Sequence, residues 1–157
     1  MGQYFKAINL DKQEYLCPWC LCGGAKLIEW SLNPYGSVFP YLLRQSDCTG
    51  GGDLGGTVSQ TIDLDAGDSI SDLIAKTMTQ EGKPMSLPSS AMAGRWAGDR
   101  IAMVGDYDSS GLYTVASNTY QNISGLLAEE YNRFMDVDEW KVQYDCCGSC
   151  RERESSE

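Results

Sequence analysis

Six of the seven cysteines lie in two groups near opposite ends of the 157-residue chain. The first group is Cys17, Cys20 and Cys22, and the second is Cys146, Cys147 and Cys150. Each group contains a pair separated by two residues, a spacing that places both thiolates at adjacent corners of a tetrahedron, and two such pairs complete a structural zinc site. The sequence predicts one metal site formed by Cys17, Cys20 or Cys22, Cys147 and Cys150, although Cys146 can replace Cys147.

The ligand chemistry of this site favours zinc. Because the chain contains no histidine, the four ligands must all be cysteines. Tetrahedral thiolate sites hold zinc rather than copper or nickel, with an iron–sulfur cluster as the alternative. A catalytic zinc keeps one open coordination position and usually has histidine ligands. We therefore expect a closed, structural zinc site.

Redox chemistry and disulfide pairing are the competing interpretations of the cysteines. Cys17-Pro-Trp-Cys20 has the form of a dithiol redox motif, but that role leaves the second group unexplained. An odd number of cysteines prevents complete pairing within one chain, and the sequence shows no secretory signal. Disulfides are rare in the cytoplasm, which is the location we expect. Six unremarkable thiols are a further alternative, and the seventh, Cys48, is predicted to be a free thiol in a loop.

A second group of polar residues lies between positions 94 and 107. Two arginines and an aromatic face can hold an anionic or nucleotide-like ligand, and two carboxylates can do acid–base chemistry or bind a cation. The alternative is purely structural, with ion pairs Arg95–Asp99 and Arg100–Asp106 around a turn and Trp96 as a core anchor. We call these six candidate ligand-binding residues the polar block: Arg95, Trp96, Asp99, Arg100, Asp106 and Tyr107.

The elements that would position these residues follow from hydrophobic periodicity and turn signals. Strands are expected at 3–10, 14–17, 100–107, 112–116 and 139–145, and helices at 25–32, 38–44, 69–79 and 124–135, with Ser124 as an N-cap. Residues 46–57 are expected to form a glycine-rich loop and 83–94 a connector. This order predicts one α+β domain over residues 1–150, a small, mostly antiparallel sheet packed by three to four helices, followed by a disordered charged tail at 151–157.

The metal site would link the two ends of this domain. It should bring residues 14–17 beside the end of the 139–145 strand. Closing a loop of about 130 residues would contribute roughly 5 kcal/mol to stability by the cross-link entropy argument.

Composition narrows the classes of partner. The formal net charge is −10 and the pI about 4.4, which disfavours nucleic acid because binding phosphates requires a basic face. No stretch approaches the ~20 apolar residues of a membrane span.

The leading hypothesis is a zinc-stabilised acidic domain that binds a protein partner. The alternatives are a small enzyme or a nucleotide- or phosphate-binding protein using the polar block, and a thiol redox protein using Cys17 and Cys20. A non-enzymatic role is favoured.

Several short motifs resemble an uncharacterised family of bacterial and fungal hypothetical proteins that begin MGQYY…NLDK. The motifs are Gly2-Gln3-Tyr4-Phe5, Asn9-Leu10-Asp11-Lys12, Ala25 to Trp30, Gly50 to Asp53, Arg95 to Arg100, Gly105-Asp106-Tyr107 and Tyr120 to Ser124. The resemblance spans most of residues 1–125 and implies no particular activity. Members of that family commonly have an acidic, glycine-containing turn at the position of residues 17–24. The resemblance thus implies that the cysteine site was added to an existing fold and that any shared function lies in the polar block.

Overall fold

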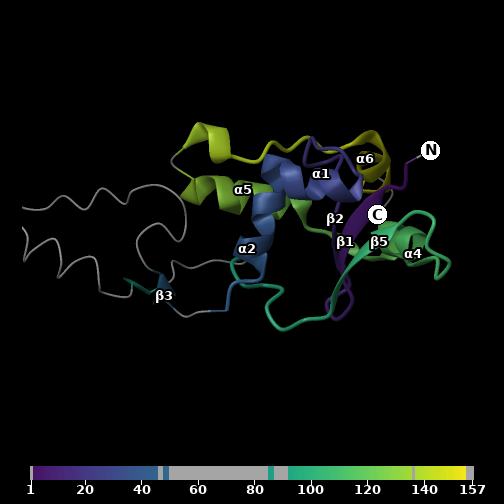
Figure 1. The fold of residues 1–157 in the computed structure, drawn as a ribbon, viewed down its shortest axis with the longest axis horizontal. Helices are drawn as coiled ribbons and strands as arrows, with labels where there is room; N and C mark the ends of the chain where they lie inside the picture. Colours follow the sequence, from purple (N-terminus) through teal and green to yellow (C-terminus); the bar gives the residue numbers. More distant parts are fainter. Residues whose placement is uncertain (1, 46–47, 50–84, 87–91, 136, 155–157) are drawn as a thin grey trace, which may run out of the picture.

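A four-stranded sheet has the strand order β5-β1-β2-β6. Figure 1 shows β1, β2 and β5 between helices α2 and α5 on one side and α4 on the other. The computed structural model describes residues 2–45, 48–49, 85–86, 92–135 and 137–154. The strands of this sheet are β1 (Phe5–Asn9), β2 (Glu14–Leu16), β5 (Ile101–Gly105) and β6 (Gln121–Asn122). β1 pairs antiparallel with both β2 and β5, whereas β6 runs parallel to β2. The expected mostly antiparallel sheet is therefore present.

The hairpin between β1 and β2 turns on Asn9. Its side-chain oxygen accepts hydrogen bonds from the backbone N–H groups of Asp11, at 3.0 Å, and Lys12, at 2.9 Å. An asparagine that bonds to the backbone two residues ahead stabilises a tight turn. Gln13 then adopts a positive φ of 55° before β2 begins. The turn fixes the register, with Ala7 opposite Leu16 and Ile8 opposite Tyr15.

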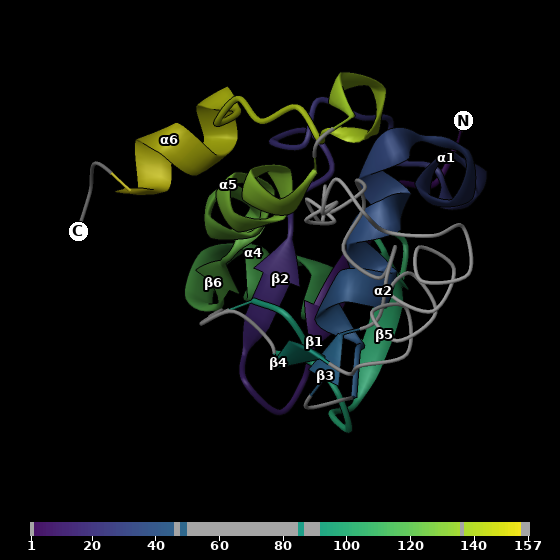
Figure 2. The same ribbon diagram turned by 90° about the vertical axis from the view of Figure 1, so that its left-hand side faces the viewer.

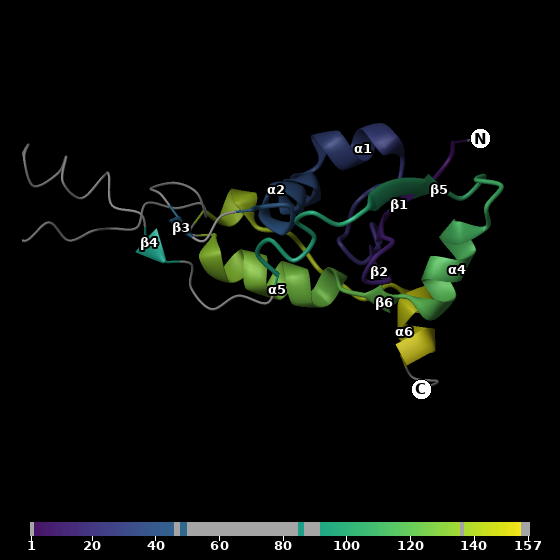
Figure 3. The same cartoon turned by 90° about the horizontal axis from the view of Figure 1, so that it is seen from below.

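The two faces of the sheet pack against different helices. Ala7 and Leu16 belong to one buried cluster, which includes Trp30, Val38 and Leu127 from α1 (Leu27–Leu32), α2 (Val38–Leu42) and α5 (Ser124–Phe134). On the other face, Ile8 and Tyr15 pack with Ala116 of α4 (Leu112–Thr119), and with Cys150 of α6 (Gly148–Glu154). This division follows from the alternation of side chains along a strand. Figures 2 and 3 show α1 and α2 on one side of the sheet and α4 and α6 on the other.

The remaining short elements complete the α+β architecture. They are the 3-10 helices η1 (Pro34–Ser37) and η2 (Asp138–Trp140) and the two-stranded sheet of β3 (Cys48–Thr49) and β4 (Met85–Ser86). α6 extends to Glu154, so the charged tail expected from residue 151 begins within a helix. The predicted helix at 69–79 and most of the predicted 46–57 loop lie outside the described residues. Within the described ranges, no helix is both long and apolar enough to cross a membrane.

Two predicted strands are wrong. Residues 112–116 do not pair back against β5 but form the start of α4, after Gly111 turns the chain with a φ of 70°. Leu112, Tyr113 and Ala116 share the helix face that packs on the sheet. A run of five residues is too short for hydrophobic periodicity to separate a strand from a helix.

The predicted strand at 139–145 is replaced by η2 and an extended segment outside the sheet. Of the three apolar side chains that the alternating pattern predicts to be buried, Val142 is buried, whereas Trp140 and Tyr144 are exposed. The Asn132 side chain of α5 takes the place of a neighbouring strand. It accepts a hydrogen bond from the Val142 N–H at 2.8 Å and donates one to the Val142 carbonyl at 2.7 Å. The strand beside β2 is instead β6.

Candidate metal centre

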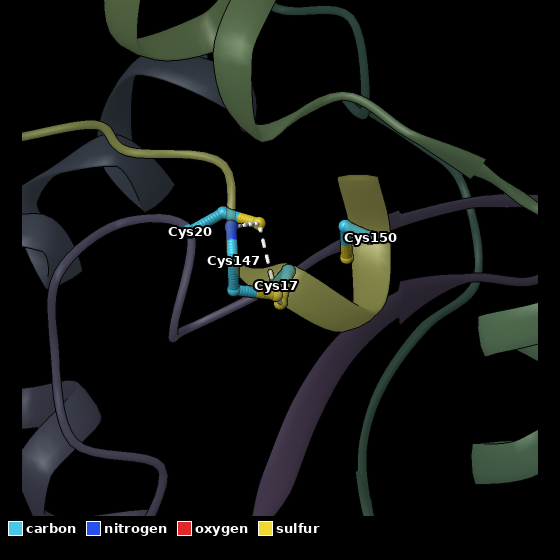
Figure 4. A group of neighbouring side chains, drawn as sticks. All are labelled: Cys17, Cys20, Cys147 and Cys150. Atoms are coloured by element: carbon cyan, nitrogen blue, oxygen red, sulfur yellow. Dashed lines mark hydrogen bonds between the residues drawn. The ribbon is translucent and has the colours of Figure 1, made fainter. Parts of the chain in front are cut away.

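Four cysteines from the two ends of the chain converge beside β2 (Figure 4). The Sγ atoms of Cys17, Cys20, Cys147 and Cys150 all lie within 4.8 Å of one another. The Cys147 sulfur is 3.9 Å from that of Cys17 and 3.6 Å from that of Cys20. A tetrahedral zinc site with Zn–S bonds of ~2.3 Å has sulfurs separated by about 3.8 Å. The four thiols can therefore hold a metal ion.

The sequence spacing does not distinguish Cys20 from Cys22 or Cys147 from Cys146, but the structure places only one of each two in the cluster. Cys20 is in the group of four, whereas Cys22 is exposed and adopts a positive φ of 53°. Cys147 is in the group, whereas the half-buried Cys146 directs its thiol toward the Cys147 carbonyl at 3.7 Å. The cluster distances of 3.6 and 3.9 Å exceed the S–S bond length of ~2.05 Å, so these sulfurs are separate thiols.

A tight turn after β2 positions the first pair. The Leu21 N–H donates to the Cys17 carbonyl at 3.2 Å, and the Gly23 N–H donates to the Pro18 carbonyl at 3.0 Å. The Cys17 N–H itself donates to the Ser124 hydroxyl at 2.8 Å. Ser124 is the first residue of α5, and Ile123 holds the N-cap position where Ser124 was predicted. Ser124 thus anchors the Cys17–Cys20 turn and does not cap its own helix.

The second pair sits where the C-terminal segment enters α6. The N–H groups of Cys150 and Arg151 both donate to the Cys147 carbonyl at 3.0 Å, which closes the turn between Cys147 and Cys150. Upstream, the Asp145 N–H donates to the Cys20 carbonyl at 2.8 Å. Apart from any metal, the C-terminal segment is therefore held to the first turn by a backbone hydrogen bond.

The four thiols occupy strongly unequal electrostatic environments. A hydrogen bond with Cys150, together with burial, raises the pKa of Cys17 to about 12. The pKa of Cys20 is raised for the same reasons. The pKa of Cys150 is lowered, chiefly because the thiols of Cys17 and Cys20 donate to its sulfur. The group therefore favours a thiolate at Cys150 and neutral thiols at Cys17 and Cys20 in the absence of a metal.

Polar groups surround the sulfurs of Cys20 and Cys150. Cys20 accepts hydrogen bonds from the Cys147 N–H at 3.4 Å and from the Asn122 side-chain amide at 3.7 Å. Cys150 accepts one from the Arg153 guanidinium at 3.1 Å and lies 3.6 Å from the Tyr15 hydroxyl. Such N–H···S contacts are typical of the groups that orient metal ligands and adjust their charge.

A buried lysine also faces the cluster. Lys6 is only 5% exposed, and its ammonium group donates to Ser117 and lies 4.2 Å from the centre of the Tyr113 ring. Burial lowers the pKa of Lys6, while the thiolates of Cys17, Cys150 and Cys147 oppose that change. Among the residues that the structure describes, no carboxylate forms an ion pair with Lys6.

The polar block makes contacts with the β1–β2 hairpin. Glu14 is 1% exposed and accepts two hydrogen bonds from Arg95, at 2.9 and 3.0 Å from its Nε, in addition to an ion pair with Nη2. The same carboxylate accepts a 2.8 Å hydrogen bond from the Trp96 indole. Trp96 is fully buried. Trp96 is thus the core anchor of the structural alternative, but Arg95 pairs with Glu14 and not with Asp99.

The remaining polar-block residues form internal hydrogen bonds and ion pairs or lie at the other end of β5. Asp99 accepts from Asn9 at 2.8 Å and pairs with Lys12, and Arg100 pairs with Asp11 at 2.7 Å. The Asp106 carboxylate accepts the Tyr4 N–H at 3.0 Å at the opposite end of β5, and Tyr107 is exposed.

A large groove among the described residues does not involve the polar block. It has a volume of about 1100 Å³ and is lined by aromatic side chains that include Trp30, Tyr41 and Trp140. None of the six polar-block residues lines this groove. The structure therefore does not gather the six residues around one cleft.

Several residues that contact the thiols or lie near them could not be predicted from the sequence. Lys6 and Arg153 belong to no motif, and the Tyr120 to Ser124 motif does not relate Asn122 or Ser124 to the cysteines. The relation of all four residues to the cysteines depends on the sheet and on α6. The one signal in the sequence is the position of Lys6 between the apolar Phe5 and Ala7 of a predicted strand, because such a charge must be buried or turned outward.

Comparisons with protein-family models, curated proteins and solved structures gave no match. The resemblance to the MGQYY…NLDK proteins stays a prediction.

Proposed function

We propose that Cys17, Cys20, Cys147 and Cys150 bind one structural zinc ion that fastens the C-terminal segment to the β1–β2 hairpin. The supporting observation is the convergence of four sulfurs within 4.8 Å, at separations close to those of a tetrahedral site. An iron–sulfur cluster requires more space because its thiolates bind different irons. Zinc therefore suits this cluster better.

The charges around the site support the same proposal. Four thiolates around Zn²⁺ leave two negative charges in excess, and Lys6 and Arg153 supply two positive charges beside them. A single thiolate at Cys150 would balance only one of these two cations, and a buried charge without a counter-charge is costly. The cationic surroundings are therefore those of a metal–thiolate centre.

A thiol redox function is less well supported by this geometry. A redox-active cysteine needs a lowered pKa and access to its partner. Cys17 and Cys20 are 1% and 0% exposed, and the pKa of each is raised. The pair therefore lacks both properties in the folded chain.

Native mass spectrometry of the purified protein tests the metal assignment. The expected result is one zinc ion per chain, lost on treatment with a strong chelator together with a fall in melting temperature. Metal analysis and a visible absorption spectrum distinguish zinc, which is colourless, from iron. A chain that carries no metal after zinc is supplied, with an unchanged melting temperature, contradicts the proposal.

We further propose that the zinc-stabilised domain acts by binding a basic protein partner. The net charge of −10 supports this role, and the polar-block side chains available for catalysis are mostly engaged in internal ion pairs. A partner identified by affinity capture should be released as ionic strength rises, because screening weakens charge attraction. Binding that is equally strong in 1 M salt (a Debye length of about 3 Å) would argue against a charge-driven partner.

A further inference from the structure

The four thiolates of the proposed zinc site are protected to very different degrees. Cys17, Cys20 and Cys150 are 1%, 0% and 3% exposed, whereas Cys147 is only half-buried. An incoming molecule can therefore reach the Cys147 sulfur more readily than the other three.

Hydrogen bonding also separates Cys147 from the other three cysteines. Cys20 accepts from Asn122 and the Cys147 N–H, Cys150 accepts from Arg153, and the Cys20 N–H stabilises the Cys17 thiolate. Within the described part of the chain, the hydrogen bonds of the Cys147 sulfur are to other sulfurs, and no N–H or O–H group donates to it. Donors withdraw charge from a metal-bound thiolate, so the sulfur without a donor remains the strongest nucleophile.

Because Cys147 is the most exposed of the four cysteines and its sulfur accepts no N–H or O–H hydrogen bond from the described residues, we propose that peroxides oxidise the zinc centre at Cys147. The inference depends on the proposed zinc site. In the first step the Cys147 thiolate attacks one oxygen of the peroxide and becomes a sulfenic acid, and hydroxide leaves. Two electrons pass from sulfur to the peroxide in this step.

The second step involves Cys20, whose sulfur lies 3.6 Å from that of Cys147 and is closer to it than the sulfur of Cys17 at 3.9 Å. The Cys20 thiolate attacks the sulfenic sulfur, an S–S bond forms and a second hydroxide leaves. In total, two thiolates and one peroxide yield one disulfide and two hydroxides. Zinc loses two of its four ligands and is released.

The geometry gives this disulfide a particular consequence. Cys20 belongs to the turn after β2 and Cys147 to the C-terminal segment, so the bond joins the same two segments that zinc joined. A disulfide within either pair would not do so. The oxidised protein therefore keeps the C-terminal segment attached after the metal has left, and a thiol reductant with zinc restores the original state.

The test uses the full chain with Cys22, Cys48 and Cys146 changed to serine, so that only the four proposed ligands can react. Native mass spectrometry first establishes one bound zinc. Hydrogen peroxide is then added below one equivalent, zinc release is followed with a chromogenic chelator, and the reaction is quenched in acid for peptide mapping. The expected result is oxidation first at Cys147, a Cys20–Cys147 disulfide, and a release rate proportional to peroxide concentration.

A pair of ligand-retaining variants provides the control. Histidine is also a zinc ligand, so Cys147→His removes the reactive thiolate, whereas Cys17→His removes a protected one. Zinc release by peroxide should slow about tenfold or more in Cys147→His and much less in Cys17→His. The mapping experiment decides the question even where a histidine variant loses its metal.

The possible failures are distinguishable. A serine-background protein that carries no zinc before peroxide overturns the proposed zinc function and this inference with it. A protein that carries zinc but is oxidised first at Cys17, Cys20 or Cys150 overturns this inference alone. Oxidation at a rate independent of peroxide concentration also overturns it, because that rate would be set by opening of the fold.

Discussion

The sulfurs of Cys17 and Cys147 lie 3.9 Å apart although 130 positions separate them in the sequence. Their proximity depends on a backbone contact as well as on the cysteines, because the Asp145 N–H donates to the Cys20 carbonyl at 2.8 Å. The segment that carries Cys147 is therefore positioned by the first turn before any metal binds. Such pre-positioning lowers the entropic cost of assembling four ligands from two ends of a chain.

Replacing one ligand should abolish zinc binding and destabilise the fold. We expect Cys150→Ser to lose the metal and to lower the free energy of unfolding by about 3 to 5 kcal/mol, because the cross-link between the chain ends disappears. The matched control is Cys22→Ser, at an exposed cysteine outside the group of four. It should retain zinc and change stability by less than about 0.5 kcal/mol.

Chemical denaturation of both variants, with and without chelator, measures these differences. In chelator the wild-type chain and Cys150→Ser should unfold at nearly the same denaturant concentration, since neither then has a metal. A large difference that persists in chelator would show that Cys150 acts through packing instead.

The buried ammonium of Lys6 should stabilise the metal-bound form and destabilise the metal-free form. In Lys6→Met the excess negative charge of the zinc–thiolate centre loses a counter-charge, so we expect the zinc form to be about 1 to 3 kcal/mol less stable. In chelator the same substitution removes a poorly compensated buried cation and should leave stability unchanged or raise it.

Melting temperatures of Lys6→Met and the wild-type chain, measured with zinc and in chelator, show whether the effect of the substitution on stability differs between the two forms. Lys141→Met is a suitable control, because Lys141 makes an exposed ion pair with Asp138, and such pairs contribute less than about 1 kcal/mol. If Lys6→Met lowered the melting temperature equally with and without metal, its role would be packing and not charge compensation.

The sequence predicted that the two cysteine groups converge, but it did not predict which members of each group enter the cluster of four. The spacing of the cysteines identified both pairs, because that spacing directly reflects the turn a metal requires. It could not choose between Cys20 and Cys22, since the choice is made by the positive φ of Cys22 and by the contact of Cys20 with Asp145. Neither feature has a local sequence signal.

The polar block shows a related limit. The sequence suggested ion pairs between its own neighbours, such as Arg95 with Asp99. In the fold, Arg95 pairs with Glu14 and Arg100 pairs with Asp11, about 80 to 90 positions away. Pairing of β1 with β5 creates these contacts. A local reading of charge identifies which residues need partners, but the partners depend on strand order.

The hydroxyl of Ser124 should contribute to both stability and metal binding. Ser124→Ala leaves the buried Cys17 N–H without its 2.8 Å acceptor, which costs about 1 to 2 kcal/mol. The exposed Ser109, changed to alanine, provides a control with little effect. Zinc affinity measured by competition with a chelator should fall in Ser124→Ala and remain unchanged in Ser109→Ala. Equal affinities would mean that the Cys17 turn does not need this anchor.

The contact between Glu14 and Arg95 should behave as a structural ion pair. Glu14 is 1% exposed, whereas the Arg95 side chain is 31% exposed, so solvent screens part of the pair. Glu14→Gln should therefore destabilise the protein by about 2 kcal/mol, below the range for a fully buried pair. Arg95→Met should cost a similar amount, because among the described residues the Trp96 indole is then the one remaining donor to the buried Glu14 carboxylate.

A double-mutant cycle separates this pair from the alternative in which the polar block serves an external ligand. In a structural pair the double variant Glu14→Gln/Arg95→Met should be more stable than the sum of the single changes implies, with a coupling of about 1 to 2 kcal/mol. The exposed pair Asp138 and Lys141 supplies the comparison and should couple by less than about 0.5 kcal/mol. Additive effects at Glu14 and Arg95 would mean that the arginine is not held by this carboxylate, and would reopen its availability for a phosphate-bearing ligand.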